Sequence, residues 1–304
     1  PRPGIAQVIA LWAGASAALS PSHQAGRRGR MTAGQETIYR LVPFAAVFLV
    51  MALWEALAPR RKLLLRRPKR WFSNLTLATA NSLLVRLLIP LSAVSLAAWL
   101  TEQKWGLLPL LQLPAWASFV LAVVALDLVI YFQHRLFHAV PLLWRLHLVH
   151  HADLDFDVTT GLRFHTVEIL LSALIKLAAV AVLGPSPWAV LFFEVLLNGT
   201  SMFNHSNIQL PAPLDRLLRA IVVTPEMHRV HHSSIPRETN SNFGFNLPWW
   251  DFLFRTYRDQ PALGHTEMEI GLSHLRNERE TERLDRMLLL PLSPLPHREK
   301  DKTV

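Results

Sequence analysis

Histidine is concentrated in one stretch of this chain, where residue types and spacing suit metal chemistry. Ten of the 14 histidines fall between positions 134 and 232, in surroundings that are otherwise strongly apolar. Eight of them form the motifs HRLFH, HLVHH and HRVHH, and two stand alone. The ten are His134, His138, His147, His150, His151, His165, His205, His228, His231 and His232.

The spacing within each motif places several imidazoles on one helix face, because residues three and four apart share a face. Neutral imidazole is the commonest metal ligand among side chains. An octahedral ion accepts about six donors, and a catalytic ion leaves one position open. Ten histidines exceed that number, so we predict that they hold two metal ions. Ordinary core histidines would explain one isolated residue, but not three clusters beside apolar spans.

The composition is typical of an integral membrane protein. Hydrophobic residues make up 51% of the chain, in several long apolar runs. The net charge is +9. In a membrane protein such an excess of basic residues is explained first by topology and lipid contact, and only second by nucleic-acid binding. The sequence has no cysteine, which excludes disulfides, thiolate-bound zinc and an internal iron–sulfur cluster. Any electrons that the site needs must therefore come from another protein.

Hydropathy predicts an all-α fold, a membrane helical bundle of about four spans or two hairpins. The apolar stretches cover residues 38–57, 75–100 and 115–132, then the pair 169–183 and 188–202. Residues 59–70 contain seven Lys or Arg and no acid, so the positive-inside rule predicts a cytoplasmic loop. With that orientation, every histidine cluster comes to the cytoplasmic face.

We predict four parts along the chain. Residues 31–205 form the transmembrane helical region, and residues 206–270 form a cytoplasmic helical cap that completes the dimetal site. Residues 1–30 are interpreted as a non-native or disordered extension, because Met31 opens a segment that resembles a natural start. Residues 271–304 are charged and contain proline, which indicates a peripheral amphipathic helix over about 275–290 and a tail.

The three histidine motifs resemble those of the fatty acid hydroxylase superfamily, in particular its sterol desaturase-like membrane di-iron oxygenases. HRLFH, HLVHH and HRVHH occur in the order that this family shows. Two further segments are similar to the sterol desaturase branch: RFH at 163–165 with Glu168, and NFG at 242–244 followed by WDFLF at 250–254. One departure is Arg255, where the family usually has a small glycine.

The resemblance implies two non-haem iron ions held by the ten histidines, and O₂ as a co-substrate. It implies that a membrane lipid, fatty acyl or sterol-like, is hydroxylated or desaturated at a C–H bond. It also implies a separate electron-donor protein of the ferredoxin or cytochrome b5 type. We expect an integral protein of a bacterial inner membrane, with no catalytic residue beyond the metal ligands and no nucleic-acid partner.

Two other functions fit the sequence less well than an oxygenase does. A membrane metalloprotease normally carries His-Glu-x-x-His, and this motif is absent from the sequence. A metal transporter would place its ligands near the bilayer midplane, whereas these histidines gather at the ends of the predicted spans. The alternative left open is a histidine-rich membrane metal-binding protein or transporter without oxygenase activity.

Asp127 and Asn198 are predicted to orient the ligands. An intramembrane carboxylate is costly and marks a functional candidate. Asp127 precedes His134 by seven residues, so both share a face at a separation of about 10 Å. We expect Asp127 to accept the N–H of an imidazole from another helix, such as His205, which Asn198 precedes by the same interval. The structural alternative pairs Asp127 with Arg86 of a neighbouring helix.

Overall fold

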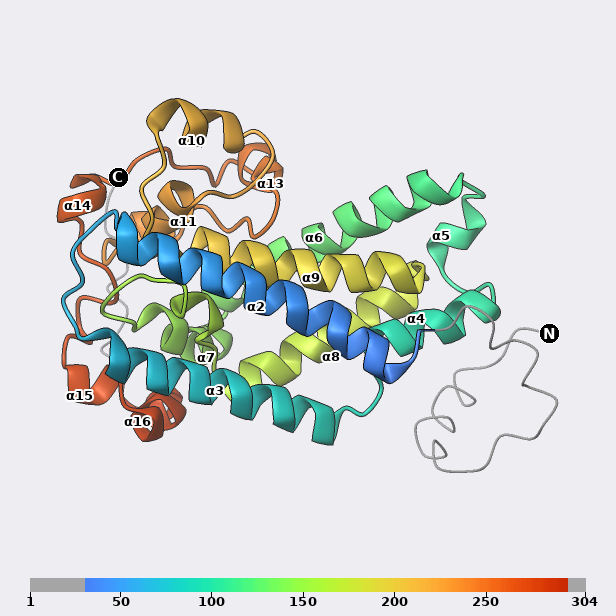
Figure 1. The fold of residues 1–304 in the computed structure, drawn as a ribbon, viewed down its shortest axis with the longest axis horizontal. Coiled ribbons are helices and arrows are strands. Elements are labelled where there is room, and N and C mark those ends of the chain that lie inside the picture. The colour runs from blue at the N-terminus through green and yellow to red at the C-terminus, as the bar shows by residue number, and fades with distance from the viewer. Residues whose placement is uncertain (1–30, 295–304) are drawn as a thin grey trace. The chain divides into compact units, whose positions relative to one another are not determined.

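The computed structural model describes residues 31–294, and regular structure there is helical (Figure 1). The predictions of an extension over residues 1–30 and of a tail at 295–304 lie outside the described residues. The described residues fall into two units, which divide between Glu36 and Thr37. In the first, Thr32 Oγ1 accepts from the Gln35 amide, which caps the start of a helix. The site lies wholly in the second.

Long helices make up the bundle, and shorter ones connect them. The long helices are α2 (Ala33–Leu57), α3 (Arg67–Leu88), α6 (Ala115–Ala139), α8 (Thr166–Leu183) and α9 (Pro187–Asn204). Two short helices, α4 (Ala93–Glu102) and α5 (Leu107–Leu110), lie between α3 and α6. Helix α4 packs against α8 and α9, and α6 packs against both of them as well.

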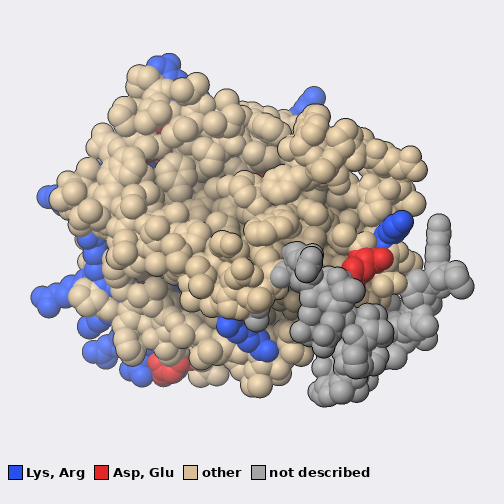
Figure 2. Space-filling model, turned by 45° about the vertical axis from the view of Figure 1, so that its right-hand side comes forward, with Lys and Arg blue, Asp and Glu red and all other residues tan. Residues whose placement is uncertain are grey.

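Four segments are long and apolar enough to cross a membrane, which agrees with the predicted membrane bundle. They are Gly34–Leu57, Arg67–Leu110, Ala115–Ala139 and Thr166–Leu183. Much of the face shown in Figure 2 carries no charged side chain, and Lys and Arg are concentrated toward one end. An uncharged flank with a basic end suits a protein surrounded by lipid.

Two of the predicted spans differ in the structure. Residues 75–100 are not one helix, because α3 ends before Pro90 and α4 begins after Ser92, whose side chain caps it. Proline lacks the amide hydrogen that would continue the helix. The stretch 188–202 lies in α9, which is not among the candidate spans; it packs between α4 and α6 and buries the carboxylate of Glu194.

Short helices gather at the end of the bundle where α2 ends and α3 begins (Figure 1). Several of them have proline in the first turn, where its fixed φ is favourable. They are α7 (Pro141–His151), η2 (Thr160–Leu162), α10 (Ala212–Leu218), α11 (Pro225–His231), α12 (Pro236–Thr239), α13 (Trp249–Leu253), α14 (Gly264–Glu267), α15 (Glu278–Thr281), α16 (Leu284–Leu289) and η3 (Leu290–Leu292).

The helix expected over about 275–290 is two short helices, α15 and α16, and it is not peripheral. Leu275 and Met287 are buried in a cluster with Leu77 of α3 and Leu148 of α7. Glu282 lies between the two helices and is buried against an arginine of the core. The segment buries both apolar and charged side chains, so it belongs to the core.

Candidate metal centre

Nine buried histidines converge at the end of the bundle that carries the short helices. Helix α6 supplies His134 and His138 from its last two turns. Helix α7 supplies three histidines, and α11 with its C-cap residue supplies three more. His205 is the C-cap of α9. All nine are buried. The six histidines of α7 and of α11 with its C-cap are His147, His150, His151, His228, His231 and His232.

The nine histidines form two groups. In each group, one atom per residue lies within 4.8 Å of the corresponding atoms of the others. The five-histidine group is His134, His138, His147, His151 and His231. The four-histidine group is His150, His205, His228 and His232.

Each HxxHH motif contributes to both groups. In HLVHH the outer pair joins the five-histidine group and the middle His150 joins the four-histidine group. In HRVHH the outer pair joins the four-histidine group and the middle His231 joins the other. The two short helices α7 and α11 therefore cross-link the groups, which accounts for three histidines in each motif.

His165 lies outside both groups, which corrects its assignment as a ligand. As the N-cap of α8, its Nδ1 accepts from the Val167 amide at 3.2 Å. Its Nε2 lies 3.3 Å from the carbonyl oxygen of Leu288 and donates to it. Both ring nitrogens are engaged in this way, so no lone pair remains for a metal ion.

The protonated nitrogen of five imidazoles follows from their partners. In each, Nδ1 faces an oxygen that can only accept, so Nδ1 carries the proton and Nε2 carries the lone pair. The five contacts are His134 to Phe243 O (2.8 Å), His147 to Glu168 Oε1 (2.6 Å), His150 to Arg163 O (3.2 Å), His205 to Ser201 O (2.8 Å) and His231 to Ser241 O (2.7 Å).

Four Nε2 atoms of the five-histidine group lack hydrogen-bond partners in the described part of the chain. Those of His134, His147, His151 and His231 are buried and bond to none of the described residues. A buried polar atom without a partner costs free energy, and native proteins rarely leave several together. This donor set fits a cation that accepts the lone pairs.

The four-histidine group contains a direct conflict between lone pairs. The Nε2 of His205 lies 3.1 Å from the Nε2 atoms of His150 and His228, and 3.2 Å from that of His232. His150 and His205 both donate from Nδ1, so their Nε2 lone pairs face each other. Two lone pairs cannot form a hydrogen bond, and the group fits an ion placed among the four nitrogens.

The environment keeps these imidazoles neutral. Burial and the neighbouring imidazoles lower the pKa of His150, His151, His228 and His232 well below the ordinary value. Burial lowers the pKa of His231 to about 3. Neutral imidazole is the form that binds a metal ion, so no proton has to leave before binding near pH 7.

A carboxylate orients His147, but it is not the one predicted. Glu168, in the first turn of α8, is buried and accepts from His147 Nδ1 at 2.6 Å. Such a carboxylate fixes the ring and raises its basicity as a ligand. The available signal in the sequence was the position of Glu168 three residues after His165.

The predicted roles of Asp127 and Asn198 are wrong in their contacts. Asp127 accepts from the indole Nε1 of Trp250 at 2.8 Å and from the amides of Asn246 and Leu247 at 3.4 and 3.2 Å. It therefore anchors a loop and bonds to neither an imidazole nor Arg86. Asn198 donates to the Glu194 carbonyl one turn earlier in α9.

Asp251 holds the same loop from the other side. Its two oxygens accept from the amides of Phe243 and Gly244, each at 2.8 Å. The Phe243 carbonyl is thereby fixed where it accepts from His134. A Cβ at Gly244 would lie 2.7 Å from Asp251 Oδ2, so this approach requires glycine. Arg255 has φ 57°, the left-handed conformation that glycine favours, which explains the family preference at this position.

Buried arginines connect the histidine helices to the rest of the chain. Arg70, at the end of the basic loop, bonds to Asp153 at 2.9 Å and to Asp157 at 2.7 Å, just after α7. Arg163 bonds to Glu282 at 2.5 Å and to the Val149 carbonyl at 2.8 Å. Breaking such a buried pair leaves an unpaired charge and costs about 3–5 kcal/mol. These pairs fix α7 in place.

Comparison with known proteins gives a consistent result. Residues 119–256 match the family model of the fatty acid hydroxylases. Ornithine lipid hydroxylase OlsE of Rhizobium tropici is 28% identical over 271 residues, which cover 86% of this chain and 80% of that protein. Alkylglycerol monooxygenase of Xenopus tropicalis is 30% identical over 58% of this chain and 38% of that protein. The human alkylglycerol monooxygenase is 29% identical, over 52% of this chain and 34% of that protein. No solved structure matches the chain significantly.

Proposed function

We propose that this chain, whose residues 119–256 match the family model of the fatty acid hydroxylases, is an O₂-dependent oxidoreductase that hydroxylates a membrane lipid at a C–H bond. The observation that carries the proposal is the pair of buried histidine groups: four Nε2 atoms of the first have no partner among the described residues, and four Nε2 atoms of the second face one another. We propose one iron ion in each group. When bound, the two ions would supply O₂ activation and oxidation of the C–H bond.

The chain's own residues would hold and shield this centre. Backbone carbonyls fix the tautomers of His134, His150, His205 and His231, and Glu168 fixes that of His147. Every one of these rings is buried, so bulk water is kept from the centre. The rigid positions lower the reorganisation needed to bind ions and substrate.

Hydroxylation is preferred over desaturation because the relatives are a lipid hydroxylase and monooxygenases. We propose a substrate with a polar head group and a hydrocarbon chain in the bilayer. A separate ferredoxin or cytochrome b5-type protein would deliver electrons, since the chain has no cysteine to hold an iron–sulfur cluster. A metal transporter is not supported, because the relatives are enzymes and the histidines lie at helix ends.

We propose that the histidine end faces the cytoplasm of a bacterial inner membrane. The basic segment over residues 59–70 runs from the end of α2 into the first turn of α3 at this end, and the positive-inside rule favours a cytoplasmic position for it. The bacterial relative from Rhizobium supports this membrane. In this proposal residues 31–205 form the transmembrane region and residues 206–270 the cap.

Iron content and isotope transfer test the proposal. Protein reconstituted anaerobically with ferrous iron should hold about two ions per chain. His231→Ala and His150→Ala should each lower that content and abolish turnover, because each removes a ligand from a different group. With ¹⁸O₂ and a lipid extract, a hydroxylated product should carry one labelled oxygen, whereas desaturation would leave the product unlabelled.

His165→Ala is the matched control, since it removes a nearby buried imidazole outside both groups. It should retain iron. Full iron content and turnover in His231→Ala or His150→Ala would contradict the ligand assignment. An iron-loaded protein that incorporates no oxygen into any membrane lipid would contradict the oxygenase.

A further inference from the structure

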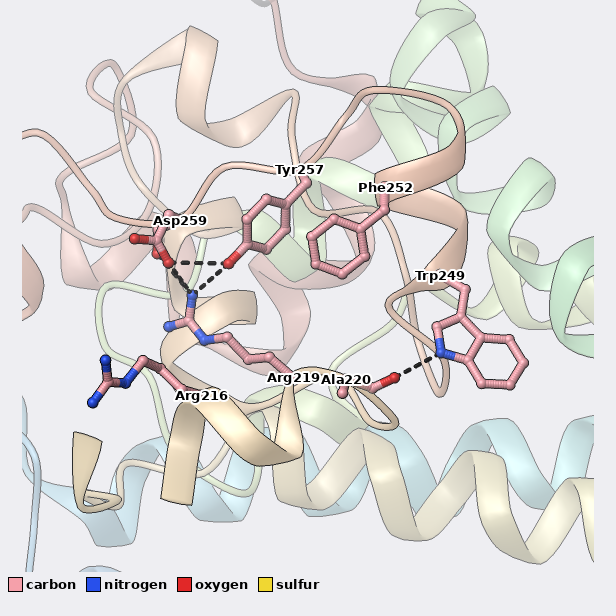
Figure 3. Close-up of a pocket in the computed structure, with 7 residues that line it drawn as sticks. All are labelled: Arg216, Arg219, Ala220, Trp249, Phe252, Tyr257 and Asp259. Carbon is pink, nitrogen blue, oxygen red and sulfur yellow. Dashed lines mark hydrogen bonds and ion pairs between the residues drawn. The ribbon is translucent and has the colours of Figure 1, made fainter. Parts of the chain in front are cut away.

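A hollow of about 480 Å³ lies between α10 and α13, apart from the histidine groups (Figure 3). Its volume is in the range of small-molecule sites, about 300–1,000 Å³. The lining is charged at one end and aromatic at the other. We call it the α10–α13 pocket; its lining residues are Arg216, Arg219, Ala220, Trp249, Phe252, Tyr257 and Asp259.

Arg219 builds the charged end. It is buried, and its Nε bonds to Asp215 Oδ2 at 2.7 Å. Its Nη1 bonds to the Tyr257 hydroxyl at 3.0 Å and to Asp259 Oδ1 at 2.8 Å. The Nη2 atom is buried and has no partner among the described residues. Arg219 is thus neutralised by two carboxylates and still has one unused donor.

One cation and one anion at this end remain open to a ligand. Arg216 is exposed and has no hydrogen bond or ion pair with the described residues (Figure 3). Asp259 is bound through Oδ1, but its side chain is 68% exposed. The pocket therefore offers a positive and a negative group with little net charge. A ligand with a matching pair of opposite charges complements it better than an anion does.

The other end is apolar and opens onto an apolar surface. The Phe252 and Tyr257 rings lie 4.3 Å apart, and Trp249 Nε1 bonds to the Ala220 carbonyl at 2.7 Å. Trp249 and Phe252 are 46% and 47% exposed. Three large aliphatic side chains beside them are also exposed: Leu217, Ile221 and Leu253.

Such a surface belongs at the interface of a bilayer. Tryptophan and tyrosine are enriched at the level of the lipid head groups, and short helices with apolar faces bind there. The chain has four candidate membrane spans, and Figure 1 shows α10 and α13 among the short helices at one end of the bundle, the level at which head groups would lie. A lipid therefore fits this surface.

We propose that the α10–α13 pocket binds the head group of a zwitterionic bilayer phospholipid. Its phosphate would bind Arg216 beside the positive charge of Arg219, and its ammonium would bind Asp259. The glycerol and upper acyl carbons would pack on Phe252 and Trp249. The proposal concerns a lipid site separate from the histidine groups, and it holds whether or not the protein oxidises lipids.

Native mass spectrometry of the full chain in detergent tests this proposal. Delipidated protein is titrated with phosphatidylethanolamine or with phosphatidylglycerol, which lacks the ammonium group. Wild-type protein should bind phosphatidylethanolamine more tightly. Arg216→Ala should weaken that binding about tenfold, as the loss of a hydrogen-bonded charge does. Asp259→Asn should remove the preference between the two lipids. Arg255→Ala, an exposed arginine of the same segment outside the pocket, is the matched control.

Three results would overturn the proposal. The first is equal or tighter binding of phosphatidylglycerol by wild-type protein, which would show that the site selects an anion. The second is unchanged binding in Arg216→Ala, and the third is the absence of any saturable lipid adduct. Because binding is measured without iron or turnover, failure here leaves the oxygenase proposal untouched.

Discussion

Replacing Glu168 should weaken iron binding in the five-histidine group in two distinguishable steps. Glu168 is buried, and its Oε1 lies 2.6 Å from His147 Nδ1. Glu168→Ala removes the acceptor and leaves a buried N–H unpaired, which costs about 1–3 kcal/mol. Loss of such a partner lowers metal affinity about 10–100-fold, which corresponds to about 1.4–2.7 kcal/mol.

Glu168→Gln keeps an oxygen that accepts from His147 but removes the negative charge. Charge-assisted hydrogen bonds are about twice as strong as neutral ones, so about half of the free energy should remain. The expected loss is then about 3–10-fold in affinity, between wild type and Glu168→Ala. A loss of iron affinity that is larger in Glu168→Ala than in Glu168→Gln distinguishes orientation of the ring from a packing effect.

The assay is an anaerobic competition with a chromophoric iron chelator, which resolves the two binding steps per chain. Only the step assigned to the five-histidine group should shift. Glu278→Gln is the matched control, because Glu278 is 45% exposed and its salt bridge to Lys69 spans 3.6 Å. Wild-type affinity in Glu168→Ala, or equal shifts in both steps, would refute the orienting role.

Two further predictions concern the anchored loop and the topology. Asp127→Asn turns one acceptor oxygen into a donor that faces the Leu247 amide and the Trp250 indole; it should lower the free energy of unfolding by about 2–4 kcal/mol in denaturant titrations. If Asp127→Asn lost iron without this destabilisation, the result would instead favour a direct contact between Asp127 and a histidine that holds iron. Because the chain lacks cysteine, single cysteines at Gln103 and Lys62 can report sidedness. A membrane-impermeant maleimide should label Gln103→Cys in intact spheroplasts and Lys62→Cys only after lysis; labelling of both in intact cells would reject the proposed topology.

The sequence by itself determined the class of the fold, and it predicted histidine clusters that could hold metal ions. Three histidine motifs beside long apolar stretches predicted a helical membrane protein, and the structure has four candidate spans. Local spacing suffices for this, because helical periodicity and hydropathy depend on neighbouring residues. The sequence also predicted that a carboxylate orients an imidazole. The predicted residue was Asp127, whereas in the structure Glu168 makes this contact.

The tertiary structure alone decided how the histidines divide between the groups. In HLVHH, successive residues advance by about 100° around the helix, so His150 and His151 point to opposite sides of the shared face. Which side meets α6 and which meets α9 depends on how α7 docks, and buried pairs such as Arg163–Glu282 fix that docking. These partners are 119 residues apart, and no local pattern encodes such a distance.

The same reason explains the errors over Asp127 and His165. Helix geometry placed Asp127 correctly on the face of His134, but its partners come from a loop more than a hundred residues later. His165 fits the pattern of a ligand in sequence, yet it caps α8 and meets Leu288 from the segment after α15. Residue type and spacing specify what a side chain can bind, whereas the packing of distant segments decides which partner reaches it.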